Sequence, residues 1–440
     1  MVRARGRIRW ILPRTRLRRA PTPRTGGAPG TRSRRRARRR CGRQHHRTRS
    51  SERSLPDDIG GRRVNAPRLA LIGTGGHGRT HVEKGLKLHT EGRVRLVAVA
   101  DPNPPAAEDL PDGVARFTDG ADLIAAGGVD IVVICTPINT HFDFASAALE
   151  AGADVLLEKP TTATLDEFER LLAIADRTGG LVQVGFQSLG SDALDIIRGR
   201  VAAGDIGEVV RYSATGAWLR NEAYYARSAW AGRRTLNGRV VADGALTNPL
   251  AHASATALAL AGATRLEDVK SLELDLWRAN DIEADDTSVA VFDLEGDVRL
   301  TTAVTLAAPS QKPPYVDVVG TSGTLRLWYT SDDIDLLGAN DEVLEQSHVG
   351  RRDLLENLLA ARDGSATLFS PLAETGAFMR LVEGVMQAPA PKLVADGSAT
   401  LVDDENGRHL VIEGIEEELE RALRLESTFT ELGSEFTRVS

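Results

Sequence analysis

A glycine-rich turn, set between a short apolar run and a helix-forming stretch, is the feature that most restricts the folds open to this chain. The apolar run covers residues 68–72, the turn reads Gly73-Thr74-Gly75-Gly76-His77-Gly78, and a helix is expected from residue 79 onward. Gly73 would allow a tight turn, Gly75 would let the backbone approach a pyrophosphate, and Gly78 would let helix and strand pack closely. The free amides at the start of the helix would then face the phosphates.

An acidic residue follows at the spacing that this interpretation requires. A second apolar strand, expected over residues 94–100, ends at Asp101, which lies 23 residues beyond Gly78. A carboxylate at this place accepts a hydrogen bond from a ribose 2′-hydroxyl and repels a 2′-phosphate. Residues 102–104 supply no arginine that would bind such a phosphate. Strand, turn, helix, strand and acid together predict a dinucleotide-binding domain that prefers NAD to NADP.

A lysine beside a carboxylate stands at the end of a later strand. The apolar run 154–157 leads into Glu158-Lys159-Pro160, 80 residues after the last glycine of the turn. In a doubly wound sheet the carboxyl ends of the strands bring catalytic groups to the ligand. Lys159 could therefore hydrogen-bond a substrate hydroxyl and help to carry its proton. A solvated salt bridge at a strand end is the alternative, and the local sequence alone does not decide between the two.

The charge of the chain is divided very unevenly. Residues 1–64 hold 22 arginines and three acidic residues, which leaves 33 basic and 58 acidic residues for the remainder, so the net charges are +19 and −25. An arginine-rich arm with few aliphatic clusters cannot bury a core, and we expect it to be disordered. Non-specific nucleic-acid binding, targeting, and a mistranslated extension upstream of a protein that begins near Val64 are the three interpretations, of which we favour the last. The acidic remainder argues against a specific nucleic-acid partner.

The cysteines and the hydropathy bear on the compartment. Cys41 and Cys135 are the two cysteines, so the sequence predicts neither a disulfide framework nor a cysteine metal site. No stretch approaches the roughly 20 apolar residues that span a bilayer. We therefore expect a cytoplasmic protein without a membrane partner.

The order of the expected elements divides the chain into four parts. Strands and helices alternate over residues 65–186, which predicts an α/β Rossmann domain with a doubly wound parallel sheet. Over residues 187–395, adjacent strands joined by tight turns predict an α+β domain with a mostly antiparallel open sheet. We expect helices on one face of that sheet and a subunit interface on the other, and hence a homodimer or homotetramer. Residues 1–64 form the arginine-rich arm, and residues 396–440 an acidic extension with a helix.

These features together resemble the family of glucose-fructose oxidoreductase and inositol dehydrogenase, usually called Gfo/Idh/MocA. The resemblance covers residues 67 to about 390 and rests on an ordered set of motifs: the turn at 73–78, Asp101-Pro102, Cys135-Thr136-Pro137 with His141, Glu158-Lys159-Pro160, and residues 185–187 and 204–209. It implies that Lys159 lies at the nicotinamide and the substrate. The implied cofactor site consists of Gly73, Gly75, Gly76, His77, Gly78, Asp101, Thr136, Pro137, His141, Glu158 and Lys159.

The family commonly carries a second catalytic element, an aspartate followed four residues later by a histidine, on a helix of the second domain. The matching residues are Asn248 and His252, which this spacing would place on one helix face. His252 is the candidate acid or base, with a core histidine as the alternative, and Asn248 is a neighbouring substrate ligand. Because an asparagine cannot accept a proton, proton transfer would fall to His252 and Lys159. Asp243 could supply a carboxylate nearby or could serve only the structure of its loop.

An irregular polar stretch before that helix concentrates aromatic and arginine side chains. Tyr224, Tyr225 and Trp230 could stack on a sugar ring, and Arg233 and Arg234 could bind its hydroxyls or a carboxylate. Anchoring of the loop against the sheet is an equally open interpretation.

The resemblance implies an NAD-dependent dehydrogenase that oxidises a secondary hydroxyl of a sugar, an inositol, another polyol or a sugar-derived acid. Two other classes stay open: an NAD-dependent glycosidase with a transient oxidation, and a cofactor-binding protein without catalysis, with which the change from aspartate to Asn248 agrees. His77 and His141 are expected at helix starts, where they would shape the cofactor pocket. No grouping of side chains in the sequence predicts a metal site.

Overall fold

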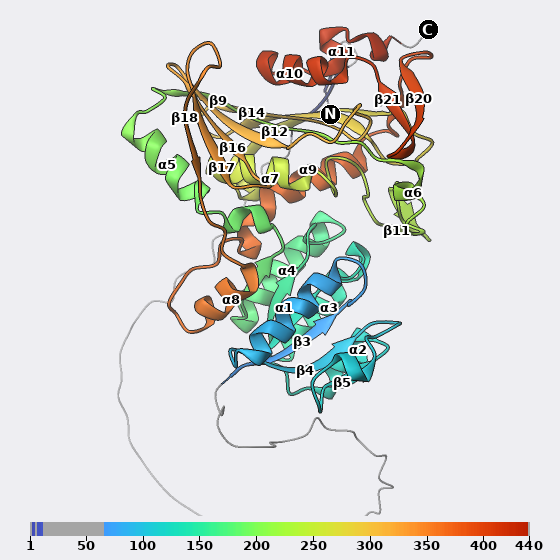
Figure 1. Ribbon diagram of the computed structural model, residues 1–440, viewed down its shortest axis with the longest axis vertical. Coiled ribbons are helices and arrows are strands. Elements are labelled where there is room, and N and C mark those ends of the chain that lie inside the picture. The colour runs from blue at the N-terminus through green and yellow to red at the C-terminus, as the bar shows by residue number, and fades with distance from the viewer. Residues whose placement is uncertain (1, 5–6, 12–65, 439–440) are drawn as a thin grey trace, which may run out of the picture.

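The N-terminal domain is built on a parallel sheet with the strand order β5-β4-β3-β6-β7-β8 (Figure 1). The computed structural model describes residues 2–4, 7–11 and 66–438. The strands are β3 (Arg68–Ile72), β4 (Arg95–Ala100), β5 (Ala115–Phe117), β6 (Ile131–Ile134), β7 (Asp154–Leu157) and β8 (Val182–Val184), and the helices are α1 (Gly78–Thr90), α2 (Gly120–Ala126), α3 (His141–Glu150) and α4 (Leu165–Thr178). This is the doubly wound order of a Rossmann domain, so the predicted fold is confirmed.

Helix α8 (Leu354–Arg362) belongs to the second half of the sequence but packs on this first sheet. Its leucines share one apolar cluster with Leu69 and Leu71 of β3. The alternate residues of β3, Ala70 and Ile72, belong to the cluster that includes α3 and α4 on the other face. Both faces of the parallel sheet are thus covered, which requires apolar strands such as β6, buried at all its positions. A division of the chain at residue 186 does not capture this return of α8.

The second domain is built on a mixed sheet with the order β1-β2-β12-β13-β14-β9-β15-β16-β17-β18, and β19 lies beside β12. Neighbours run antiparallel, except that β9 is parallel to β14 and β19 is parallel to β12. The main strands are β9 (Val209–Ala217), β12 (Val269–Arg278), β13 (Thr287–Leu294), β14 (Arg299–Thr305), β15 (Tyr315–Gly320), β16 (Thr324–Trp328), β17 (Asp333–Leu337), β18 (Val343–His348) and β19 (Lys392–Leu393). The predicted, mostly antiparallel open sheet is confirmed.

Three helices lie between this sheet and the N-terminal domain (Figure 1): α5 (Ala193–Ala203), α7 (Ala251–Leu260) and α9 (Gly376–Gln387). Helix α7 packs against β9 and β15, and α9 packs against β12. Helix α7 is apolar around most of its circumference, as expected for a helix with neighbours on all sides. The polar loop before it contains α6 (Glu222–Tyr225) and the small hairpin β10 (Thr235–Leu236) and β11 (Arg239–Val240).

The face expected to form a subunit interface is covered in part by the chain's own C-terminal segment. This segment consists of the hairpin β20 (Ala399–Asp404) and β21 (Gly407–Ile412), followed by α10 (Ile415–Leu425) and α11 (Phe429–Leu432). Leu419 and Phe429 are buried in one cluster with Val289 and Ala303 of the sheet. The expectation of a free face is therefore wrong over β9 and β14, because the amphipathic α10 buries its apolar side there.

Two short strands, β1 (Val2–Ala4) and β2 (Arg7–Ile11), lie inside the arm that was expected to be disordered. Strand β2 pairs with β12, so for these residues the structure differs from that expectation. A strand without a neighbour on one side offers free backbone hydrogen-bonding groups to another strand, which gives a physical reason for the pairing. Residues 12–65, with most of the arginine-rich arm, Cys41 and the expected start near Val64, lie outside the described residues. In the part of the chain that the structure describes, no helix is long and apolar enough to cross a membrane.

Candidate active site

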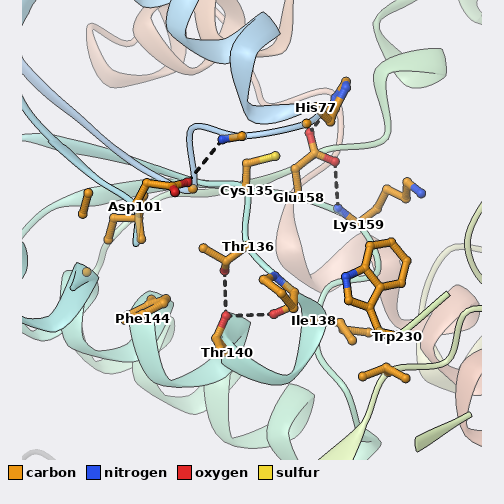
Figure 2. A pocket seen from close by; sticks show the side chains of 18 of the residues that line it. His77, Asp101, Cys135, Thr136, Ile138, Thr140, Phe144, Glu158, Lys159 and Trp230 are labelled. Atoms are coloured by element: carbon orange, nitrogen blue, oxygen red, sulfur yellow. Dashed lines mark hydrogen bonds and ion pairs between the residues drawn. The ribbon is translucent and has the colours of Figure 1, made fainter. Parts of the chain in front are cut away.

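A cavity of about 670 Å³ opens where the carboxyl ends of the parallel strands face the second domain (Figure 2). Its wall comes from the glycine-rich turn after β3, the ends of β4, β6 and β7, and the polar loop before α7. Doubly wound sheets bind their ligands at this edge. The predicted site residues that line the cavity are Gly73, Gly75, Gly76, His77, Asp101, Thr136, Pro137, Glu158, Lys159, Trp230, Asn248 and His252.

The glycines of the turn separate into two structural roles. A Cβ atom at Gly73 would come within 2.1 Å of the carbonyl oxygen of Cys135, and one at Gly78 within 2.2 Å of the carbonyl oxygen of Gly73. These two glycines therefore permit close backbone packing. At Gly75 the nearest atom to an added Cβ is 3.9 Å away, and at Gly76 none lies within 4 Å. The middle of the turn thus presents bare backbone to the cavity, and this arrangement fits a pyrophosphate group.

Asp101 follows β4 and lies beside the same turn. Its Oδ2 accepts hydrogen bonds from the backbone amides of Thr74 (2.8 Å) and Gly75 (3.2 Å). Among the described residues that line the cavity, Lys159 is the sole lysine or arginine. Arg116 of β5, which sequence proximity did not reveal, reaches the carbonyl oxygen of Pro104 at 3.4 Å but does not line the cavity. This set of side chains fits the ribose of NAD better than the additional phosphate of NADP.

His141 lies behind the cavity wall, in contrast to its predicted contact with the cofactor. Its side chain is almost fully buried, with Nδ1 at 2.9 Å from the carbonyl oxygen of Pro160 and Nε2 at 2.9 Å from that of Thr136. The ring therefore braces the loop after β6 against the loop after β7. In the first of these loops the hydroxyl of Thr140 lies 2.7 Å from that of Thr136 and donates to the carbonyl of Pro137 (Figure 2).

Glu158 is the most contacted carboxylate in the cavity. Its Oε1 lies 2.9 Å from His81 Nε2, 3.5 Å from His77 Nε2 and 3.0 Å from Gln187 Nε2. Burial alone would raise the pKa of Glu158, but the hydrogen bonds with His77 and His81 outweigh it and hold that pKa below its usual value. The same contact raises the pKa of His77. Glu158 therefore stays ionised, and it is not the solvated salt-bridge partner that the local sequence left open.

Lys159 points from the end of β7 toward the second domain. Its Nζ donates to the side-chain oxygen of Asn248 at 2.6 Å and to the backbone oxygen of Asn248 at 2.9 Å. Burial lowers the pKa of Lys159, and the charges of Glu158 and Asp243 oppose this shift. The ammonium group is therefore held by the residue that stands in the place of the family's usual aspartate.

Asp243 lies one step behind Asn248, outside the cavity wall. The side-chain amide of Asn248 donates to Asp243 Oδ1, so Asp243 orients Asn248 with its oxygen toward Lys159. The buried Asp243 carboxylate is itself held by two bonds from Arg227 Nη2 (3.0 and 2.8 Å) and by the amide of Gly232 (2.7 Å). The chain thus supplies a carboxylate near Lys159, but through an asparagine rather than directly.

His252 faces the cavity from α7, whereas Asn248 precedes that helix. The prediction that both residues share one helix face is wrong, because α7 begins at Ala251. Pro249 disfavours a helical conformation at the residue before it, which explains the late start. His252 Nδ1 lies 3.1 Å from the hydroxyl of Ser188. Burial and the nearby charge of Lys159 lower the pKa of His252 to about 3, so the ring is neutral at neutral pH.

We expect a His252→Gln substitution to weaken the pH dependence of stability. The folded pKa of His252 is about 3, against an ordinary value of 6.5. Between these values the unfolded chain binds a proton that the folded chain does not, so stability is lost as the pH falls below 6.5. At pH 5 this group should cost the unsubstituted protein about 1 to 2 kcal/mol. Urea unfolding at pH 7.5 and pH 5 measures the difference, and an equal loss in both proteins would contradict the assignment.

The aromatic side chains before α7 have different roles. Trp230 lines the cavity, and the Arg227 guanidinium lies over the rings of Tyr224 (3.8 Å) and Trp230 (4.6 Å). Tyr225 does not line the cavity, and burial raises the pKa of its hydroxyl. It packs beside Gly232, so the structure supports loop anchoring for Tyr225.

Arg234, considered a candidate for binding a substrate, instead caps α9. Its Nη2 donates to the carbonyl oxygens of Val385, Met386 and Ala388 at 2.6 to 2.9 Å. Cations at the C-terminus of a helix satisfy its free carbonyl groups and interact favourably with its dipole. The interpretation of loop anchoring therefore holds for this arginine.

Sequence reasoning did not single out His81, Gln187, Arg227 or Ser188. The spacing of four residues between His77 and His81 is a signal that could have paired them. Gln187 belongs to the motif Gly185-Phe186-Gln187, and a Cβ atom at Gly185 would lie 2.8 Å from the Glu158 carboxyl group. That motif therefore makes room for Glu158 and supplies one of its donors. No local pattern marks Arg227 or Ser188, whose partners are distant in the sequence.

Two models of one protein family match the chain. The first, described as an oxidoreductase family with an NAD-binding Rossmann fold, matches residues 67–186, and the second, the GFO/IDH/MocA C-terminal domain, matches residues 196–326. Together these matches span more than half of the chain. The chain belongs to the GFO/IDH/MocA oxidoreductase family. The resemblance inferred from the motifs is confirmed, and residues 67–186 form the NAD-binding domain of this family.

Individual family members match a shorter part. The rhizopine catabolism protein MocA of Rhizobium meliloti is 32% identical over 143 residues, which are 32% of this chain and 44% of that protein. The scyllo-inositol 2-dehydrogenase (NAD(+)) of Bacillus subtilis is 33% identical over 148 residues, which are 33% of this chain and 43% of that protein. The chain thus matches less than half of the length of these relatives.

Solved structures share the fold over both domains. The WlbA dehydrogenase from Bordetella pertussis, in complex with NADH and UDP-GlcNAcA, has a TM-score of 0.59 at 22% identity, covering 73% of this chain and 95% of that one. Levoglucosan dehydrogenase in complex with NADH has a TM-score of 0.60 at 16% identity, covering 73% and 96%. At these identities the likeness concerns the fold alone.

Proposed function

We propose that this protein is an NAD-dependent dehydrogenase that oxidises a secondary hydroxyl group of a sugar, an inositol or a sugar-derived acid. The observation that carries the proposal is the position of Lys159, whose Nζ is held by Asn248 inside a cavity that begins at the glycine-rich turn. When bound, the nicotinamide supplies the acceptor for the hydride. The protein must then position the hydroxyl group and receive its proton.

Lys159 is the proposed proton acceptor. Because burial lowers its pKa, the neutral amine is reached more readily than in an exposed lysine. The amine nitrogen takes the hydroxyl proton while the carbon loses its hydrogen as hydride, which leaves a carbonyl group. Asn248 keeps the amine in place through its two oxygens.

His252 has a different proposed role from that of a resting proton carrier. Its pKa of about 3 keeps the ring neutral, and its Nδ1 is engaged with Ser188, which leaves Nε2 to hydrogen-bond a substrate hydroxyl. Trp230 offers an aromatic surface on the same cavity. These residue types suit a ligand with several hydroxyl groups and an apolar ring face. The names of the related inositol 2-dehydrogenases and of levoglucosan dehydrogenase support this substrate class.

The absorbance of reduced nicotinamide tests the proposal. We would supply the full chain with NAD or NADP and a panel of inositols, sugars and sugar acids, with a Lys159→Ala variant as control. A signal that needs NAD, one substrate class and Lys159 is expected. Release of a sugar without net NADH would favour the glycosidase alternative, and bound NAD without any turnover would favour a non-catalytic protein.

An Asp243→Asn substitution tests whether Asp243 positions the Lys159–Asn248 pair. The charge of Asp243 raises the pKa of Lys159, so its removal should move the Lys159 limb of the pH–rate profile to lower pH. Misplacement of Asn248 should also lower turnover, by up to about a hundredfold. Asp317→Asn is a matched control, because Asp317 forms a similar buried pair with Arg326 (2.8 and 2.8 Å) away from the cavity. An identical pH profile in all three proteins would limit Asp243 to a structural role.

A cytoplasmic setting and a homodimer or homotetramer remain proposals. The covered face over β9 and β14 moves any sheet-mediated interface toward β15–β18, where the edge strand β18 is largely exposed. Light scattering of the full chain measures the oligomeric state.

A further inference from the structure

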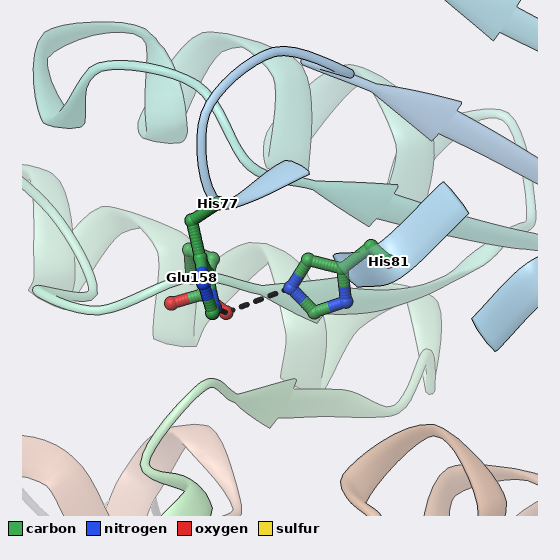
Figure 3. A group of neighbouring side chains, drawn as sticks. All are labelled: His77, His81 and Glu158. Carbon is green, nitrogen blue, oxygen red and sulfur yellow. Dashed lines mark hydrogen bonds and ion pairs between the residues drawn. The ribbon is translucent and has the colours of Figure 1, made fainter. Parts of the chain in front are cut away.

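Three side chains of metal-ligating type converge beside the glycine-rich turn (Figure 3). They are His77 in the turn, His81 in the first coil of α1, and Glu158 after β7. One ligand atom of each lies within 4.8 Å of the others. His77 already has helical backbone angles (φ −63°, ψ −26°), so the spacing of four residues places both imidazoles on one side of α1.

The distances match those between ligands of a tetrahedral zinc ion. Zinc bonds of roughly 2.05 Å to nitrogen and oxygen separate two tetrahedral ligand atoms by about 3.3 Å. Glu158 Oε1 lies 2.9 Å from His81 Nε2 and 3.5 Å from His77 Nε2, on either side of that value. Two histidines and one glutamate are a known ligand set for zinc with an open fourth position.

The surroundings of Glu158 also suit a ligand. A carboxylate oxygen has two lone-pair directions, and Gln187 Nε2 uses one of those of Oε1 at 3.0 Å. The backbone amide of Lys159 lies 3.2 Å from Oε2, so both oxygens are oriented by donors outside the ligand set. The His77 side chain is 57% exposed, whereas His81 and Glu158 are 12% and 8% exposed. An ion can therefore enter past His77 and meet a ready pair behind it.

We propose that His77, His81 and Glu158 form a binding site for a divalent transition metal ion of the zinc type, with one position left for water or another ligand. The ion replaces the hydrogen-bonding protons between the imidazoles and the carboxylate. This site corrects the expectation, drawn from the sequence, that no metal-ligating group is present.

The site adjoins Lys159 and the turn proposed to hold the cofactor. A divalent charge on Glu158 would disfavour the protonated form of Lys159 and occupy the space beside the turn. We therefore expect zinc to act as a reversible inhibitor. This consequence rests on the proposed function, whereas the binding site itself does not.

Zinc binding to the full chain, stripped with a chelator and without cofactor or substrate, tests the site directly. Competition with a chromogenic chelator gives the affinity, and Co²⁺ in place of zinc gives a visible spectrum that reports tetrahedral coordination. We expect His77→Gln and His81→Gln each to lose tenfold or more in affinity, together with the tetrahedral cobalt spectrum. His348→Gln is the matched control, since His348 is exposed and pairs only with Asp333 among the contacts described for it.

The comparison of variants separates this site from other histidines. His45 and His46 of the arm are present in every variant, so any zinc they bind cancels in the differences. Thermal unfolding without metal checks that the variants are folded. Equal affinity in the unsubstituted protein and in folded His77→Gln, or no tetrahedral cobalt spectrum in the unsubstituted protein, would overturn the proposal. Failure of the dehydrogenase assay leaves the metal measurement unaffected, because no cofactor enters it.

Discussion

A Lys159→Ala variant should bind NAD nearly as well as the unsubstituted protein and turn over about 10² to 10⁴ times more slowly. The substitution removes the amine that Asn248 holds at 2.6 and 2.9 Å, and with it the proposed acceptor of the hydroxyl proton. The glycine-rich turn and Asp101, which lie at the other end of the cavity wall along the chain, stay intact. Titration with NAD and steady-state kinetics measure the two quantities separately.

Lys159→Arg is the matched control for this prediction. Arginine keeps the positive charge but stays protonated, so it cannot accept the hydroxyl proton. Turnover should therefore remain low in Lys159→Arg as well. Recovery of turnover in that variant would show that charge alone is needed, and near-normal turnover in Lys159→Ala would remove the lysine from the mechanism.

Alanine at Gly78 and alanine at Gly75 should have opposite effects. A Cβ atom at Gly78 would lie 2.2 Å from the backbone oxygen of Gly73, so the turn must move, and we expect a loss of about 2 to 3 kcal/mol in the free energy of unfolding. At Gly75 the nearest atom is Asp101 Oδ2 at 3.9 Å, so the fold accommodates the methyl group. Because that methyl would face the cavity, the affinity for NAD should fall by at least about tenfold, or 1.4 kcal/mol.

Neither glycine has a positive φ, so the two substitutions differ in what the methyl group meets rather than in backbone strain. Denaturant unfolding without cofactor gives the stability of each variant, and titration with NAD gives its affinity. A stable Gly78→Ala protein would show that the turn adapts more easily than its contacts indicate. An unchanged affinity in Gly75→Ala would place the pyrophosphate away from this part of the turn.

Features that depend on neighbours in the chain could be predicted from the sequence. The turn, its flanking strands, the acid 23 residues later and the lysine after β7 follow from local patterns and short spacings. The strands of the second domain were likewise expected close to where they occur, for example residues 269–278 for β12 and 315–320 for β15. Each depends on alternating burial and on turn residues, which act over a few positions.

The one local expectation that was wrong concerns Asn248 and His252. A spacing of four residues indicates a common helix face only if the helix includes both, and Pro249 delays the helix until Ala251. The two residues nevertheless reach the same cavity, because the turn before α7 carries Asn248 toward Lys159.

What the sequence by itself determined is the class of domain, the family and the position of Lys159 beside a dinucleotide turn. Only the tertiary structure decided that Asp243 acts on Lys159 through Asn248, that His77 and His81 meet Glu158, and that the C-terminal segment covers the sheet. The physical reason is range. Helices, turns and strands reflect contacts between near neighbours, whereas these arrangements depend on groups far apart in the chain that only the packing of whole domains brings within hydrogen-bonding distance.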